Sequence, residues 1–400
     1  KGQVASITDF NGNVTTYTRN DRGLETSRTE AAGTPLARTI TTQRHPTLRL
    51  PTQIDEPGRS TRMAYDSKGN MTSRTVSAGG QNWTWTATYT AKNQLASMTT
   101  PGGRTTRYEY DAAGGLAKII NAMNHVTQIT NDAAGRPVRI TDPNGLVTTL
   151  VYDGKGRLIS RTEGAAKTLY EYDAAGQMVR TTLPTGASFT HSYDAAHRLT
   201  RTMDGLGNSI NLTYDAASNV IGREVRDASG AVVTKRGFEH DSRGLMTHEI
   251  GAYGWATRYD RDGNGNIKLI TDSAGAPTDF TIDALNRTVR KVDAMGYRTD
   301  TAYDVQDLPV RQIEPRGLVT DIQRDGMGRV IAVHSPDSGT TTYTRDLDGN
   351  ILTKTDARNV TSRFEYDALS RVTRADYGNG EVFTYLYDQT ANGVGRLSSV

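Results

Sequence analysis

One short motif recurs along this chain and constrains its fold more than any other feature. An aspartate appears in the pattern Tyr-Asp-x-x-Gly, or a decayed form of it, and from Asp283 to Asp388 every step between these aspartates is 21 residues. Ten of the 19 tyrosines directly precede such an aspartate. Because each unit of a repeat array packs only on its neighbours, residues 1–400 can form a single array with no separate domain boundary.

The repeat aspartates run from one end of the chain to the other. They are Asp21, Asp66, Asp111, Asp132, Asp153, Asp173, Asp194, Asp215, Asp241, Asp260, Asp283, Asp304, Asp325, Asp346, Asp367 and Asp388. The pairs that we expect to be structural elements of the array are Tyr65, Asp66, Tyr110, Asp111, Tyr152, Asp153, Tyr172, Asp173, Tyr193, Asp194, Tyr214, Asp215, Tyr259, Asp260, Tyr303, Asp304, Tyr366, Asp367, Tyr387 and Asp388. Two longer gaps are expected to hold decayed repeats, at residues 41–46 and at residues 91–93 after Tyr89.

The segment from Val147 to Asp173 contains one complete unit. Residues 147–152 are β-branched and aromatic, residues 153–156 have the composition of a turn, and residues 157–162 can form a second strand. Two strands around a short turn predict a β-hairpin. Each repeat is therefore expected to be one hairpin.

The turn residues have separate physical roles. The carboxylate of Asp153 can accept hydrogen bonds from backbone N–H groups about two residues on, and Gly156 can adopt the positive φ that other residues resist. We expect the tyrosine before the turn to face the arginine after it, with the guanidinium over the phenol ring, in a structural tyrosine ladder. The expected pairs are Tyr152 with Arg157, Tyr193 with Arg198 and Tyr366 with Arg371.

Composition favours a thin, strand-rich structure. Apolar residues make up 35% of the chain and there are 40 glycines. The net charge is +3 with both signs interspersed, which supports neither nucleic-acid nor membrane-surface binding. The absence of cysteine excludes disulfides and zinc–thiolate sites, and no apolar run approaches the roughly 18 residues that a membrane span needs. Trp83 and Trp85 alternate as one face of a strand requires, which favours packing over sugar stacking.

The repeat length determines the size of the sheet. At one hairpin per repeat the chain would hold roughly 38 strands, and at about 4.8 Å per strand a flat sheet would be about 180 Å wide. Twisted sheets do not stay open and flat at that width. We therefore expect an all-β fold in which continuous antiparallel hairpins form a large curved, spiralling sheet that is part of a hollow shell. The alternative is a β-propeller-like fold, because two repeats have the length of one four-stranded blade.

No group of residues stands out as a catalytic, cofactor-binding or metal site. Residues 260–266 resemble a calcium loop, but Thr271 occupies the position where a bidentate glutamate is needed, so a repeat turn is the better interpretation. His191 and His197 flank a turn, and two ligands alone do not make a metal site. We expect no enzymatic activity and no cofactor.

The motifs at residues 152–158 and 172–176 resemble the tyrosine-aspartate (YD) repeats of bacterial Rhs proteins, which the insecticidal toxin-complex shell proteins and the animal teneurins share. Residues 38–46, 50–52 and 56–59 resemble a stretch typical of Rhs cores. The resemblance covers essentially the whole chain. It implies a β-sheet that spirals into a closed cocoon around a variable C-terminal toxin domain.

From this resemblance we expect a structural encapsulation module, the shell segment of an Rhs-type secreted toxin that encloses and protects a C-terminal toxin domain before delivery. The implied partners are that toxin domain and a secretion-system component or chaperone, and the implied localisation is secreted or on the bacterial cell surface. The aspartyl self-cleavage motif of the family and the toxin are expected outside this chain, whose two ends are interpreted as truncations. The alternative is an extracellular adhesion module, or a glycan- or protein-recognition module built on the same repeats.

Overall fold

The computed structural model describes residues 2–400, and these residues form strands and turns without a helix. The expected all-β array of antiparallel hairpins is confirmed. Contacts divide the chain into two units: unit 1 comprises residues 2–111, Leu116–Thr127 and Phe280–Val400, and unit 2 comprises Ala112–Gly115 and Gln128–Asp279. Unit 1 therefore contains two runs of strands that are far apart in the sequence.

The strands of unit 1 are short and follow one another at nearly regular intervals. Its N-terminal run contains β1 (Ser6–Thr8), β2 (Val14–Arg19), β3 (Glu25–Ala32), β4 (Arg38–Arg44), β5 (Pro51–Glu56), β6 (Arg59–Tyr65), β7 (Met71–Ala78), β8 (Gln81–Tyr89), β9 (Leu95–Thr99), β10 (Thr105–Tyr110) and β11 (Leu116–Ile120). Its C-terminal run contains β27 (Thr288–Val292), β28 (Arg298–Tyr303), β29 (Pro309–Ile313), β30 (Val319–Arg324), β31 (Val330–Ser335), β32 (Gly339–Arg345), β33 (Ile351–Thr355), β34 (Thr361–Tyr366), β35 (Val372–Asp376), β36 (Val382–Thr384), β37 (Leu386–Tyr387) and β38 (Leu397–Ser399).

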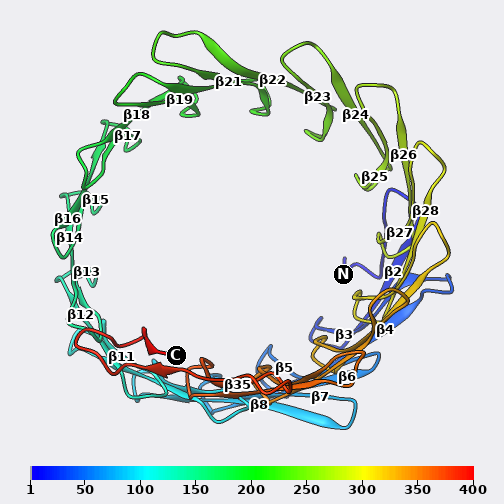
Figure 1. Cartoon of the computed structure of the whole chain (residues 1–400), viewed down its shortest axis with the longest axis horizontal. Helices are drawn as coiled ribbons and strands as arrows, with labels where there is room; N and C mark the ends of the chain where they lie inside the picture. Colours follow the sequence, from blue (N-terminus) through cyan, green and yellow to red (C-terminus); the bar gives the residue numbers. More distant parts are fainter. Residues whose placement is uncertain (1) are drawn as a thin grey trace. The chain divides into compact units, whose positions relative to one another are not determined.

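The remaining strands lie wholly or partly in unit 2 and have the same lengths and spacing. They are β12 (Val126–Asn131), β13 (Pro137–Thr141), β14 (Val147–Tyr152), β15 (Leu158–Glu163), β16 (Ala166–Tyr172), β17 (Met178–Thr182), β18 (Ser188–Tyr193), β19 (Leu199–Asp204), β20 (Ser209–Tyr214), β21 (Val220–Arg226), β22 (Val232–His240), β23 (Met246–Ile250), β24 (Ala256–Arg261), β25 (Ile267–Thr271) and β26 (Pro277–Ile282). In Figure 1 the strands of unit 2, coloured cyan to yellow-green, follow one another as a single curved layer.

In three stretches of the chain each strand pairs antiparallel with the strand that follows it. This holds from β1 to β11, from β12 to β26 and from β27 to β36. A propeller would interrupt this pairing after each four-stranded blade. The propeller-like alternative is therefore wrong.

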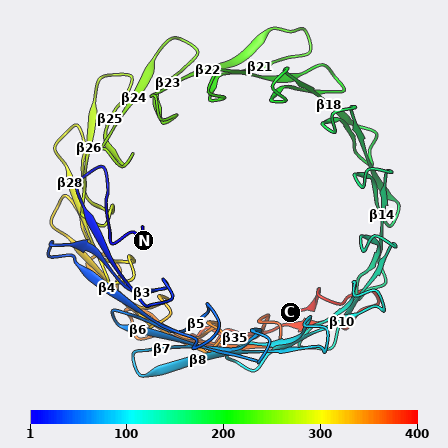
Figure 2. The ribbon, with the colours of Figure 1, turned by 180° about the vertical axis from the view of Figure 1, so that it is seen from behind.

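Few side chains in residues 2–400 are fully buried, as expected for a thin sheet. One cluster combines Val76, Ala78 and Trp83 with the partly buried Trp85 and Met327. The first four come from β7 and β8, whereas Met327 lies in the turn between β30 and β31, so the cluster joins the two runs of unit 1. Figure 2 shows these runs side by side from behind, with the N-terminal strands in blue and the C-terminal strands in orange.

Candidate functional site

The aspartate closes the turn of a Tyr-Asp hairpin, as the hairpin of β14 and β15 illustrates. The carboxylate of Asp153 accepts hydrogen bonds through Oδ1 from the backbone N–H groups of Lys155 (2.9 Å) and Arg157 (3.0 Å), and through Oδ2 from Arg157 Nε (2.7 Å). Gly156 adopts a φ of 82°, which a residue with a side chain resists. The hydrogen bond from the Arg157 amide is the main reason that the pKa of Asp153 lies below its ordinary value.

The same bond from the backbone N–H four residues on recurs at other repeat aspartates, namely Asp66, Asp173, Asp194, Asp215, Asp304 and Asp367. Asp111 begins the corresponding turn after β10. The decayed repeats keep the turn with other acceptors. The Thr90 hydroxyl accepts from the N–H of Gln94 at 3.2 Å, and His45 Nδ1 accepts from the N–H of Leu48 at 3.1 Å.

The tyrosine hydroxyls connect successive hairpins. Tyr172, for example, donates to the backbone carbonyl of Leu158 at 2.9 Å, and Leu158 is the first residue of the second strand in the preceding hairpin. The same bond to the preceding hairpin, 2.7 to 3.0 Å long, is made by Tyr65, Tyr89, Tyr110, Tyr152, Tyr193, Tyr214, Tyr303 and Tyr366. Each of these tyrosines therefore bonds to the neighbouring repeat.

In several repeats the arginine after the turn lies over the tyrosine of the next hairpin and not over that of its own. Arginine Cζ to ring-centroid distances are 4.7 Å for Arg157 over Tyr172, 4.7 Å for Arg198 over Tyr214 and 4.3 Å for Arg371 over Tyr387. The expected pairing of Tyr152 with Arg157, Tyr193 with Arg198 and Tyr366 with Arg371 is therefore wrong. The reason is register, because a β-bulge places Tyr152 opposite Leu158 while Asp153 holds Arg157 in the turn.

The Tyr259-Asp260 pair does not form a turn, so its assignment to the structural motif is wrong. Both residues lie inside β24, and the following turn is closed by Asp262, whose Oδ1 accepts from the N–H of Asn266 at 2.8 Å. The signal was present in the sequence, since Asp262 lies 21 residues from the repeat aspartates before and after it. The loop that resembled a calcium site is this turn.

Arginine takes the place of tyrosine in several repeats and keeps its hydrogen bond to the preceding hairpin. The pairs from arginine Nε to a backbone carbonyl are Arg261 to Met246 (3.3 Å), Arg324 to Pro309 (3.2 Å) and Arg345 to Val330 (3.3 Å). The residue before the repeat aspartate is therefore a long side chain with a donor near its end. A search for the Tyr-Asp pair alone misses the repeats in which this residue is arginine.

Replacing Tyr172 by phenylalanine tests the bond between hairpins. The variant keeps the ring under Arg157 but leaves the Leu158 carbonyl without the hydroxyl that donates to it. We expect a loss of about 0.5–1.5 kcal/mol in the free energy of unfolding, measured by urea denaturation. Tyr170→Phe is the matched control on the same strand, and an equal loss in both variants would contradict the assigned role.

The two runs of unit 1 meet along a seam of contacts between turns. Its polar contacts are Arg38 Nη2 to Asp307 Oδ2 (2.8 Å), Gln306 Nε2 to the Pro57 carbonyl (2.7 Å), the Gly102 N–H to Asp348 Oδ1 (2.9 Å), Arg104 Nη1 to Asp348 Oδ2 (2.5 Å) and Arg371 Nη2 to Met123 Sδ (3.3 Å). The partners lie 244 to 269 residues apart in the sequence. The partners from the C-terminal run lie in Tyr-Asp turns or in the equivalent turns of other repeats. The partners from the N-terminal run lie in, or next to, the turns at the other end of the hairpins.

Opposite charges face one another at close range along this seam. Burial alone would raise the pKa of the Asp307 carboxyl, but the guanidinium groups of Arg38 and Arg287 outweigh it and hold the pKa below 3.8. Asp388 accepts two hydrogen bonds from Arg371, at 2.8 and 2.6 Å, and one from the Gly395 N–H. The bonds from Arg371 are the main cause that lowers the pKa of Asp388 from 3.8 to about 2.

This pKa predicts the pH range in which the Arg371–Asp388 pair contributes to stability. A carboxyl with a depressed pKa stabilises the fold above its ordinary pKa, and the contribution is lost as pH falls through the folded value. We expect Asp388→Asn to lower the melting temperature at neutral pH, and the difference from wild type to shrink between pH 3.8 and about 2. A difference that stays constant over this range would contradict the assignment.

His191 and His197, which flank one turn, each bond to a different neighbour. His191 bonds to Thr202 (3.1 Å) and His197 bonds to Gln177 (3.0 Å), so these two side chains do not face one another. Within residues 2–400 no group of three potential ligands could hold a metal ion. Over the same residues there is also no helix long and apolar enough to cross a membrane.

Two family models match parts of the sequence. Residues 55–222 match the model described as Teneurin YD-shell, and residues 345–382 match the RHS Repeat model. No curated protein matches the sequence.

Three crystal structures are among those that share this fold. The crystal structure of TcdB2-TccC3-TEV matches with a TM-score of 0.77 and 12% identity over 96% of this chain and 24% of that chain. TcdB2-TccC3 matches with a TM-score of 0.62 and 14% identity over 94% and 22%, and TcdB2-TccC3-Cdc42 with 0.57 and 12% over 95% and 26%. At these identities the likeness concerns the fold, and this chain spans about a quarter of the matched chains.

The repeat turns and the tyrosine bonds between hairpins extend beyond the two segments that the family models match. Residues 55–222 are similar to the teneurin YD-shell, residues 345–382 are similar to the RHS repeat, and the chain shares its fold with the TcdB2-TccC3-TEV structure.

Proposed function

We propose that this array is a shell segment that encloses and protects a C-terminal toxin domain of the same protein before delivery. The observation that carries the proposal is the seam of unit 1, where two single-layer runs join along their turns by ion pairs, hydrogen bonds and the packing of Met327 on the buried cluster. A layer joined in this way is a wall without a thick core. The likeness in fold to TcdB2-TccC3-TEV supports this role.

The other parts of the proposal follow from the same role. Residues 1–400 act as one array, the Tyr-Asp residues other than Tyr259 and Asp260 hold the wall and carry no chemistry, and the chain is not an enzyme. The partners are the enclosed toxin domain and a secretion-system component or chaperone. The protein is secreted or displayed on a bacterial surface.

A protection assay on the complete gene product tests enclosure. A tag is placed at the C-terminus of the proposed cargo, and its loss during proteinase K digestion is compared with its loss from the cargo expressed without the array. We expect the tag to survive much longer in the complete protein, because a closed wall excludes the protease. Equal rates of loss would contradict the proposal. The adhesion or recognition role would then be the remaining candidate, and binding of the isolated chain to a glycan array would test it.

A further inference from the structure

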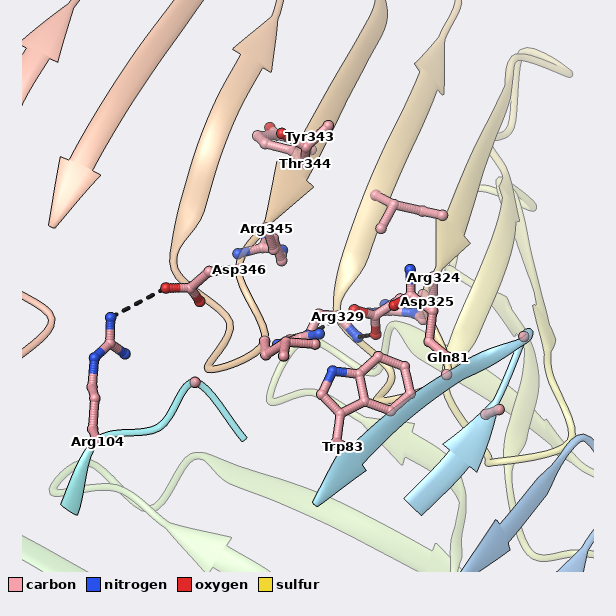
Figure 3. A pocket seen from close by; sticks show the side chains of 16 residues that line it. Gln81, Trp83, Arg104, Arg324, Asp325, Arg329, Tyr343, Thr344, Arg345 and Asp346 are labelled. Carbon is pink, nitrogen blue, oxygen red and sulfur yellow. Dashed lines mark hydrogen bonds and ion pairs between the residues drawn. The ribbon is translucent and has the colours of Figure 1, made fainter. Parts of the chain in front are cut away.

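A cavity of about 740 Å³ lies in unit 1 where the N-terminal run meets the turns of the C-terminal run (Figure 3). This volume is in the range of small-molecule sites. Trp83 on β8 and Arg104 before β10 line one side. The other side is formed by the end of β30, the turn that carries Arg329, and the end of β32.

The cavity carries an excess of positive charge. Its side chains include four arginines and two aspartates, which are Arg104, Arg324, Arg329, Arg345, Asp325 and Asp346. Two of the arginines donate to backbone carbonyls, and Arg104 pairs with Asp346 and Asp348. These hydrogen bonds and ion pairs occupy N–H donors of the three arginines, but the positive charges of the guanidinium groups remain in the lining of the cavity. The cavity therefore favours an anion over a neutral or cationic ligand.

Arg329 differs from the arginines at the same position of other repeats. Arg157 donates from Nη1 to the carbonyl of the next repeat aspartate, Asp173, and stacks on Tyr172. The residue that corresponds to Tyr172 after Arg329 is Arg345, so no ring is present there. Arg329 bonds through Nε to Asp325 at 2.7 Å, and the ring that its guanidinium meets is the indole of Trp83.

Trp83 places a second donor beside this guanidinium. Its side chain is 1% exposed, Arg329 Cζ lies 5.5 Å from its ring centroid, and its Nε1 has no hydrogen-bond partner in the described chain. Figure 3 shows the indole nitrogen on the side of the ring that faces Arg329. An indole N–H can only donate, and a buried donor of this kind requires an acceptor.

We propose that this cavity is a binding site for a compact oxyanion, a carboxylate or phosphate group, held between Trp83 Nε1 and the terminal nitrogens of Arg329. Both groups are donors, and a planar guanidinium binds either oxyanion in two-point geometry. The remaining arginines supply a positive field around the site. The site does not depend on the proposed shell role, because all its residues belong to unit 1.

Isothermal titration of the 400-residue chain with inorganic phosphate and, separately, with glutarate tests the site and distinguishes its two sources. We expect saturable binding of at least one probe, weakened about tenfold or more by Arg329→Gln and several-fold by Trp83→Phe, which keeps a ring but removes the N–H donor. Arg157→Gln is the matched control, since it alters the same turn position in unit 2, and it should bind as wild type does.

Two results would overturn the proposal. One is the absence of saturable binding of both probes to the wild-type chain. The other is equal binding by the wild-type chain and Arg329→Gln, with circular dichroism confirming that Arg329→Gln keeps the strand content of the wild type. Binding of one probe alone supports the site and identifies whether phosphate or carboxylate is its ligand.

Discussion

Replacing Gly326 by alanine is expected to open the seam of unit 1. A Cβ atom at this residue would lie 2.2 Å from the Cβ of Ala78 and 3.1 Å from its backbone carbons, whereas carbon atoms in contact are separated by about 3.5–4.0 Å. Because Gly326 does not have a positive φ, the backbone itself accepts alanine without strain. The two runs must therefore move apart, at a cost of about 1–3 kcal/mol or more.

Hydrogen exchange is the suitable measurement, because repeat arrays open locally and a single unfolding midpoint can conceal the effect. We expect faster exchange in β7, β8 and the turn between β30 and β31. Gly154→Ala is the matched control: Gly154, like Gly326, directly follows the aspartate of a repeat turn, and a Cβ there would meet nothing within 4 Å. Unchanged exchange at the seam in Gly326→Ala would contradict the packing described for it.

Truncating Trp83 to alanine should have the largest effect of any single substitution in the buried cluster. Its side chain is 1% exposed, like that of Val76, and it contacts both runs of unit 1. In a wall with few buried side chains, no other group can fill the space. We expect the free energy of unfolding of unit 1 to fall by about 3–5 kcal/mol. Urea denaturation and hydrogen exchange in β8 measure this loss.

Trp255→Ala serves as the comparison for this variant. Trp255 is 68% exposed, so its truncation should change stability by no more than about 0.5 kcal/mol. If both tryptophan variants unfolded at the same urea concentration, the cluster around Trp83 would not have the structural role assigned to it.

The hairpins were predictable because their determinants are local. Asp153 and Gly156 lie three residues apart and close one turn, so composition and spacing suffice. Asp260 follows a tyrosine but does not close a turn, whereas the 21-residue step identifies Asp262. The repeat requires a turn and a long side chain with a donor, and Arg261 supplies that donor in this repeat. The 21-residue spacing therefore persists where the tyrosine is lost.

The seam and the cavity were not predictable from the sequence, because their partners are more than 240 residues apart. Gly326 and Gly154 occupy the same turn position, yet only Gly326 meets another run. Nothing local to Arg329 reveals that it faces Trp83 instead of a tyrosine of the next repeat. The stacking of each arginine on the following hairpin also depends on a bulge that a simple hairpin register does not include.

Cryo-electron microscopy of the complete gene product tests the central claim, that these repeats form an enclosing wall, most directly. We expect a wall one sheet thick, with its runs joined at the contacts of Arg38, Arg104 and Gly326, around density for another part of the protein. A solid fold in which the sheet packs face to face against a second layer, with no enclosed volume, would contradict it.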